Sequence, residues 1–174
     1  MEKWDILNSA GEPVGKTAVR GRTILRNGEY HLVVHIWVLT NDGKYIIQQR
    51  SRTKRLMPGE WAATGGAAIA GEDSFTAASR ELKEELGIDS DRSTLKFIKR
   101  LKRRNSFVDV WAIKTDEKPE QLKLQRSEVA RVKAVTSDAL KFMIEKGRFH
   151  DYGKYYWSVI FGGIQEGLKY ESKS

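Results

Sequence analysis

Three glutamates crowd into positions 81 to 85 of this 174-residue chain. Like charges three or four residues apart on a helix repel each other, at a cost of roughly 0.2–0.5 kcal/mol per pair. A divalent cation between the carboxylates would offset that cost, because Mg²⁺ prefers oxygen ligands and keeps its other positions for water and substrate phosphates. Arg80 can also reach Glu84, four residues on. Glu81, Glu84 and Glu85 are therefore candidate metal ligands, and an exposed acidic helix face is the alternative.

The residues around these glutamates have the pattern of one amphipathic helix. Apolar residues recur at helical spacing, at Phe75, Ala78, Leu82 and Leu86. This pattern predicts a helix from about residue 73 to 86, and Gly87 is suited to end it. At 100° per residue the three glutamates fall beside the apolar stripe. We therefore expect them at the edge of the core and not on the far solvated face.

The other segments predict a mixed sheet with flanking helices. Paired short runs in residues 1–30 indicate a hairpin, and the Gly- and Ala-rich stretch 57–72 indicates a loop. Strands are expected at 31–39 (buried and central), 44–50 (its antiparallel partner), 95–102, 106–113 and 129–135. Helices are expected after Ser137, as a cap, and in the aromatic segment 149–164. Because strands and helices do not alternate regularly as βαβ units, the pattern predicts an α/β or α+β sandwich. We expect a single domain over residues 1–174, with C-terminal helices in 137–174.

The charge of the chain predicts an anionic partner. Lys and Arg number 31 against 23 Asp and Glu, which gives a net charge of +8, and the densest basic runs are 50–55 and 99–104. Cysteine is absent, which excludes disulfides and thiol chemistry. No run of 18 apolar residues and no signal-like start is present, so we expect a cytoplasmic protein without a membrane partner.

Two other motifs favour structural roles. The run GEPVGKT (11–17) has one residue too few between its glycines for a phosphate-binding P-loop, and a strand follows it where a helix is needed. It is interpreted as part of a hairpin. His31 and His35 lie in a strand-like run without a third ligand nearby, so they are interpreted as core or strand-edge histidines.

The spacing around the glutamates resembles the Nudix box. Gly66 is followed after five residues by Glu72, and after seven more by RELKEELGI from Arg80 to Ile88, so every fixed position of the box is met. The resemblance implies an α/β/α sandwich around a mixed sheet, in which residues 65–88 form a loop, a helix and a second loop. It also implies that the three glutamates bind Mg²⁺, with Mn²⁺ as the alternative ion, and that Arg80 braces them. Gly66 would provide a tight turn, and Glu72 would tie the loop to the helix.

The resemblance also implies a reaction. Nudix hydrolases commonly cleave a nucleoside diphosphate linked to another group, through a metal-activated water. The basic run before the box would hold the diphosphate, with Arg50, Arg52 and Lys54 as candidate ligands. The expected partner is a small-molecule diphosphate, with nucleic acid as a less favoured partner, and the expected assembly is a monomer or homodimer.

A further similarity is to the Nudix branch that includes isopentenyl-diphosphate isomerase. It rests on EYHLVVHIWVL, QQRS and the following Lys54, and the box. It implies that His31 binds metal, that Arg50 and Lys54 hold diphosphate, and that Glu128 is a further metal ligand or general base. The catalytic cysteine of the isomerase is missing, since Thr64-Gly65-Gly66-Ala67 stands in its place. Hydrolysis is therefore favoured, and the alternatives are an isomerase-like enzyme or a catalytically silent module that binds RNA or a nucleotide.

Overall fold

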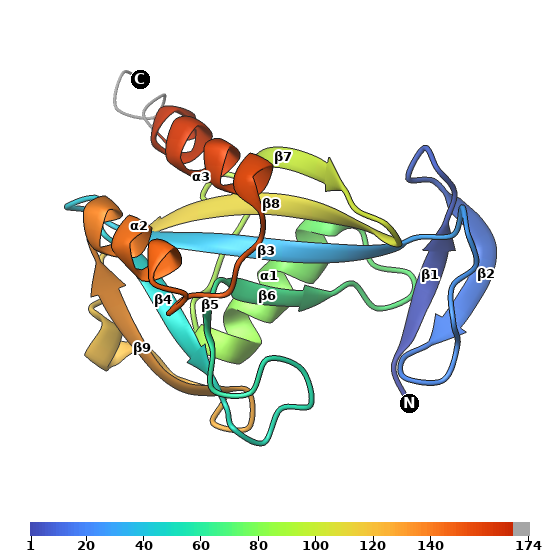
Figure 1. The fold of residues 1–174 in the computed structure, drawn as a ribbon, viewed down its shortest axis with the longest axis horizontal. Helices are drawn as coiled ribbons and strands as arrows, with labels where there is room; N and C mark the ends of the chain where they lie inside the picture. The colour runs from blue at the N-terminus through green and yellow to red at the C-terminus, as the bar shows by residue number, and fades with distance from the viewer. Residues whose placement is uncertain (169–174) are drawn as a thin grey trace.

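The computed structural model describes residues 1–168, and within them three α-helices flank a mixed β-sheet (Figure 1). The strands of the main sheet are β3 (His31–Thr40), β4 (Tyr45–Arg50), β5 (Trp61–Ala62), β6 (Thr64–Ala67), β7 (Lys96–Lys102), β8 (Ser106–Thr115) and β9 (Val129–Val135). The helices are α1 (Ser74–Leu86), α2 (Ser137–Glu145) and α3 (Lys154–Gly167). This is the α/β/α sandwich with a mixed sheet that the sequence predicted.

Strand β3 lies at the centre of the seven-stranded sheet. It runs parallel to β8 along its whole length, while its other edge pairs antiparallel with β6 and then with β4. Successive side chains of a strand point to opposite faces. Val34 and Ile36 accordingly pack with the helix α1, and Trp37 and Leu39 pack with α2 and α3 on the other face. The predicted central strand and its antiparallel partner are confirmed.

The helix ends follow local capping rules. Asp73 accepts a hydrogen bond from the Thr76 amide at 2.7 Å and begins α1. Gly87, at φ 74°, ends it and donates a hydrogen bond from its amide to the Lys83 carbonyl. The expected cap of α2 was wrong by one residue, because the Thr136 hydroxyl accepts from the Ala139 amide and Ser137 is the first helical residue.

Two further predictions need correction. The stretch 57–72, expected to be a loop, contains the short strands β5 and β6. Its Gly- and Ala-rich residues have low strand propensity, but β5 pairs with β4 and β6 pairs with β3. The aromatic segment becomes helical only at Lys154, and residues 149–153 are an irregular lead-in. Residues 169–174 of the expected C-terminal helical region lie outside the described residues.

The N-terminal hairpin stands at one end of the molecule, beside the start of β3 (Figure 1). Its strands β1 (Lys3–Leu7) and β2 (Pro13–Val19) form a separate two-stranded sheet. It docks through a bridge from Leu7 to Tyr30 and through a hydrogen bond from the Ala70 amide to the Lys3 carbonyl. The hairpin reading of GEPVGKT is confirmed, and the hairpin lies next to the loop that leads into α1.

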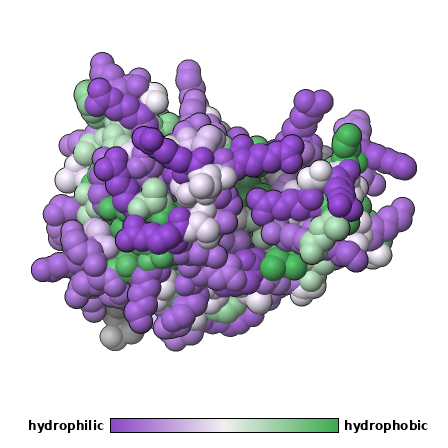
Figure 2. All heavy atoms as spheres, turned by 90° about the horizontal axis from the view of Figure 1, so that it is seen from below, coloured by the Kyte–Doolittle hydropathy of each residue, from purple (hydrophilic) through white to green (hydrophobic). Residues whose placement is uncertain are grey.

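The molecular surface is mainly hydrophilic, with hydrophobic side chains in small separate patches on the face that Figure 2 shows. Over residues 1–168, no helix combines the length and the apolar character needed to cross a membrane.

Candidate active site

Glu85 occupies the buried end of the candidate site. Its side chain points from α1 toward the sheet and is only 3% exposed. One carboxylate oxygen, Oε2, accepts hydrogen bonds from Gln48 Nε2 at 2.9 Å and from the Gly65 amide at 3.2 Å. Burial, reinforced by the nearby charge of Glu81, raises the Glu85 pKa to about 8. The fold therefore keeps a carboxyl group at a position where its charge lacks a compensating cation.

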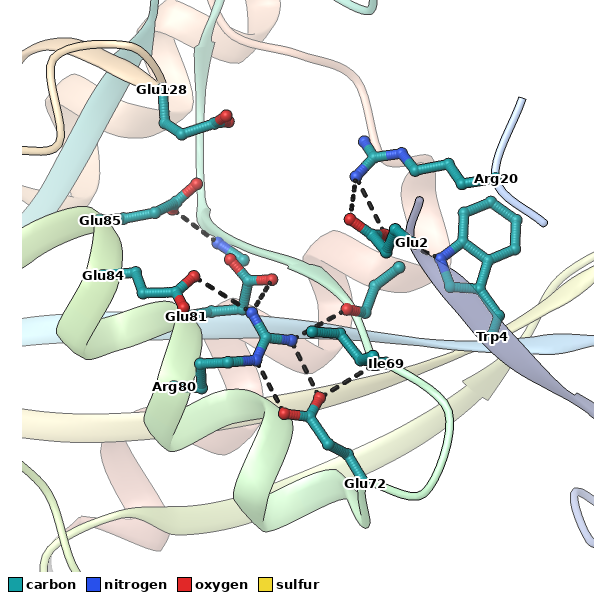
Figure 3. A network of polar contacts seen from close by, with 12 residues as sticks. Glu2, Trp4, Arg20, Ile69, Glu72, Arg80, Glu81, Glu84, Glu85 and Glu128 are labelled. Carbon is teal, nitrogen blue, oxygen red and sulfur yellow. Dashed lines mark hydrogen bonds and ion pairs between the residues drawn. The ribbon is translucent and has the colours of Figure 1, made fainter. Parts of the chain in front are cut away.

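Arg80 organises the other carboxylates (Figure 3). Its Nε and Nη2 donate to the two oxygens of Glu72 at 2.8 and 2.9 Å, a bidentate pair. Its Nη1 donates to Glu81 at 2.9 Å and to Glu84 at 3.2 Å, so the expected contact between Arg80 and Glu84 is present. Glu72 also accepts from the Ile69 amide at 2.9 Å. One guanidinium thus joins the loop before α1 to two of the three clustered glutamates.

Two of the three carboxylate partners of Arg80, Glu72 and Glu81, have pKa values shifted in opposite directions. The hydrogen bonds from Arg80 lower the Glu72 pKa, whereas burial raises the pKa of Glu81 despite its own bond to Arg80. The Glu81 side chain is 13% exposed and that of Glu84 is 49% exposed. The glutamates therefore run from the buried edge of the core toward solvent, as their position beside the apolar stripe predicted.

Gly66 has a different role from the one expected. It lies within β6, opposite Val34, and not in a tight turn. A Cβ atom at Gly66 would overlap the Glu81 carboxylate, and one at Gly65 would overlap the Val34 carbonyl. Gly65 is therefore required because the backbone of the neighbouring strand approaches it closely, whereas a side chain at Gly66 would displace the Glu81 carboxylate.

Glu128 reaches the site from a segment distant in sequence. It lies in the turn before β9, where its carbonyl accepts from the Ser51 amide at 2.8 Å. Its carboxylate forms an ion pair with Lys54, the lysine expected to bind diphosphate. The structure thus brings together residues 54, 85 and 128, three of the candidate site residues.

A cavity of about 220 Å³ joins these residues. Its lining includes the four candidate carboxylates, the two candidate diphosphate ligands Arg50 and Lys54, and the glycine pair. Arg50 is held in place by a bond from its Nε to the Leu56 carbonyl at 3.0 Å. Arg52 is exposed and does not line the cavity, so the structure does not bring it to the predicted site.

Sequence reasoning missed two charged residues of the cavity, Glu2 and Arg20. They come from the N-terminal hairpin, where Arg20 Nη1 donates to both oxygens of Glu2 at 3.1 and 3.0 Å. Hairpin pairing could have suggested that residues 2 and 20 face each other. Their place beside the box depends on how the hairpin docks, which carries no local signal.

The two histidines of β3 lie outside the cavity lining. His35 is half-buried, and its Nδ1 lies 2.8 Å from the hydroxyl of the buried Tyr156, which confirms a histidine at the core. The His31 ring stacks on Trp4 with 4.2 Å between centroids, and its Nδ1 is buried without a hydrogen-bond partner among the described residues. Burial lowers the His31 pKa to about 4, so the ring is neutral.

The donor set of the cavity fits a divalent metal. Four carboxylates face one cavity, and burial keeps the pKa of two of them, Glu81 and Glu85, above its usual value. A bound cation would stabilise their charged forms. Within residues 1–168, no three acidic or histidine side chains already converge on one point as a preformed metal site, since Arg80 holds Glu81 and Glu84.

Comparison with known proteins identifies the family. The model of the NUDIX domain matches residues 29–167. The chain belongs to the Nudix family. A Nudix hydrolase of Listeria monocytogenes, lmo0368, is 39% identical over 153 residues, which are 87% of this chain and 90% of that protein. Nudix hydrolase 3 of Arabidopsis thaliana is 32% identical over 165 residues, covering 83% of this chain and 20% of that longer protein.

The fold of this Nudix protein is shared with solved structures. The crystal structure of DR0079 from Deinococcus radiodurans has a TM-score of 0.76 at 24% identity, covering 91% of this chain and 97% of that one. Family membership makes this chain a hydrolase of diphosphate bonds, acting on a small molecule, and Nudix hydrolases generally use divalent cations.

Proposed function

We propose that this Nudix hydrolase is Mg²⁺-dependent and cleaves the pyrophosphate bond of a nucleoside diphosphate linked to another group. One observation carries the proposal: four carboxylates and two candidate diphosphate ligands, distant in sequence, line the same cavity. An acidic helix face exposed to solvent would not bury Glu85 or place it in one cavity with Arg50 and Lys54.

The carboxylates of the cavity would bind the metal, and its cationic side chains would bind the diphosphate. Glu81, Glu84 and Glu85 would hold Mg²⁺, with Glu128 as a further ligand or as the general base. When bound, the cation supplies charge neutralisation of the diphosphate and a water of lowered pKa. Arg50 and Lys54 would orient the diphosphate through charge-assisted hydrogen bonds.

Arg80 is proposed as a positioning residue. Its bidentate contact with Glu72 fixes the guanidinium, and the remaining nitrogen holds Glu81 and Glu84 at the cavity. Because three of its partners are carboxylates, Arg80 reduces the repulsion among them before a cation enters.

We also propose that the chain belongs to the branch that includes isopentenyl-diphosphate isomerase, on the sequence layout described above. Hydrolysis is favoured over isomerisation, because the cysteine is missing and the position before the helix is a glycine pair against which Glu81 packs. His31, the metal ligand that this branch implies, stacks on Trp4 instead of lining the carboxylate cavity.

The test is phosphate release, with added phosphatase, from nucleoside di- and triphosphates, nucleotide sugars, dinucleoside polyphosphates and isopentenyl diphosphate. Each substrate is measured with Mg²⁺, with Mn²⁺ and with chelator. Turnover that requires the metal and disappears in the double variant Glu81→Gln with Glu85→Gln would support the proposal. Absence of turnover on every member of the panel would contradict it and favour a silent binding module.

A further inference from the structure

A second cavity, of about 280 Å³, adjoins the carboxylate cavity. The two share three cationic side chains, those of Arg20, Arg50 and Lys54. The remaining lining comes from the hairpin and the loop after β4, namely Trp4, Gly21, Arg55 and Leu56. A diphosphate held at Arg50 and Lys54 would therefore extend, through one of its substituents, into this second cavity.

One carboxylate fixes the two hairpin side chains that line the second cavity, those of Trp4 and Arg20. Glu2 Oε1 accepts from Trp4 Nε1 at 2.9 Å, and both Glu2 oxygens accept from Arg20 (Figure 3). The Trp4 ring is also stacked on His31, with planes only 13° apart. The indole is thus held by its nitrogen and by one face before any ligand arrives, which reduces the ordering cost of binding.

The lining of this cavity selects a class of ligand. Four of its side chains are cationic, and Arg55 forms no ion pair with any residue of the described 1–168. A purely apolar chain would remove water from all four cations and leave Arg55 without a compensating anion, which is costly. An aromatic base suits both parts of the lining, because its ring can contact an indole and its polar edge can accept hydrogen bonds from arginine.

We propose that Trp4 and Arg20 of the N-terminal hairpin bind the nucleobase of the substrate, while Arg50 and Lys54 hold its diphosphate. This inference rests on the proposed function and adds the residues that recognise the base. The hairpin precedes residue 29, where the match to the NUDIX domain begins. Base recognition would then come from a part of the chain outside the family's common domain.

The test measures ligand binding in metal-free buffer, so that it does not depend on turnover. Isothermal titration calorimetry compares AMP, GMP, CMP and UMP with ribose 5-phosphate, which lacks the base. In Trp4→Leu we expect at least one nucleotide to bind about ten-fold more weakly or worse, the loss expected for one stacked base. Binding of ribose 5-phosphate should stay unchanged, and Trp4→Phe should restore most of the nucleotide affinity.

The variants include a matched control. Arg20→Gln should weaken nucleotide binding, whereas Arg22→Gln removes an exposed arginine two residues away that lies outside both cavities. Arg22→Gln should bind every ligand as the wild type does. If Trp4→Leu does not fold, the comparison of Arg20→Gln with Arg22→Gln decides the question alone.

Several results would overturn the inference. Equal loss of nucleotide and ribose 5-phosphate binding, unchanged nucleotide binding in the variants, or no nucleotide binding by the wild type would each do so. A loss confined to isopentenyl diphosphate, titrated beside the nucleotides, would also overturn it and assign the cavity to an apolar chain. Base-dependent binding without any metal-dependent hydrolysis would support the inference and contradict the proposed function, so the two failures remain distinct.

Discussion

Polar groups lie in the core on both faces of the central sheet. The two groups differ in whether hydrogen-bond partners within the protein satisfy them. On the α3 face, the Tyr156 hydroxyl accepts from Trp37 Nε1 at 2.9 Å and can donate to His35 Nδ1. On the α1 face, Glu85 accepts two hydrogen bonds but keeps a raised pKa beside an open cavity. The first cluster is closed and neutral, as a stabilising core requires. The second is left incomplete, as a binding site requires.

The largest expected effect is loss of activity in Glu85→Gln. The glutamine oxygen can still accept from Gln48 Nε2 and the Gly65 amide, so the substitution removes the charge but keeps the local bonds. We expect turnover to fall by roughly 10²–10⁴-fold, on the scale of losing a catalytic carboxylate.

The same variant should not lose stability, because a buried carboxyl group with a raised pKa is replaced by a neutral amide. Initial rates with Mg²⁺ and urea unfolding of the same preparation measure both quantities. Full activity, or a loss of activity that only accompanies unfolding, would place Glu85 with the structural cluster.

The closed cluster predicts an acid-dependent loss of stability. Burial lowers the His35 pKa to about 3. Between about pH 6.5 and 3, His35 is therefore protonated in the unfolded chain and neutral in the folded chain. The free energy of unfolding should therefore fall by up to about 1.4 kcal/mol per pH unit from pH 6.5 toward 3, about 3 kcal/mol at pH 4.

Urea unfolding between pH 7 and 4 measures this dependence, and His35→Gln should flatten it. His31→Gln should also flatten it over this range, since the His31 pKa is lowered to about 4, and the two contributions separate only below pH 4. Identical slopes in wild type and His35→Gln would show that the buried imidazole does not control acid stability.

Removal of one hydroxyl should separate stability from activity. Tyr156→Phe leaves Trp37 Nε1 and His35 Nδ1 without their common partner, at a cost of about 1–3 kcal/mol for a buried unsatisfied group. Turnover per folded molecule should be unchanged, because Tyr156 is on the face away from the carboxylates. Tyr155→Phe is the matched control, since that side chain is 65% exposed. A fall in turnover at unchanged stability would contradict this prediction and show that the Tyr156 hydroxyl affects the carboxylate site.

The smallest expected effect is stabilisation by metal. A cation that binds only the folded chain, at ten times its dissociation constant, adds about 1.4 kcal/mol to the free energy of unfolding. Wild type should gain this with Mg²⁺ and lose it with chelator. The double variant Glu81→Gln with Glu85→Gln should gain nothing, and an equal gain there would locate the metal elsewhere.

What the sequence predicted best was governed by local chemistry. Asp73 and Gly87 bound α1 because capping depends on a few neighbouring residues, and the spacing of Arg80 and Glu84 ensured their contact. The pairing of β6 with β3 was missed because Gly- and Ala-rich residues show no strand pattern alone. Glu2 and Arg20 were missed because their approach to α1 depends on the packing of two separate sheets.

Arg52 shows a second limit of sequence reasoning. It shares a basic run with Arg50 and Lys54, and composition alone cannot tell them apart. Arg50 ends β4 and Lys54 lies on the turn that brings it to Glu128, whereas the Arg52 side chain is exposed away from the cavity.

The close packing around Gly65 and Gly66 restricts the directed evolution of this enzyme. Any side chain at either position overlaps an atom of the neighbouring strand or of Glu81. Randomising the Gly65 codon would strain the backbone, and randomising the Gly66 codon would displace the Glu81 carboxylate from its place at the cavity. Randomising the codons of the hairpin residues that border the second cavity would vary the ligand contacts while leaving the carboxylates in place. Screening effort for new substrates is therefore best directed to the hairpin.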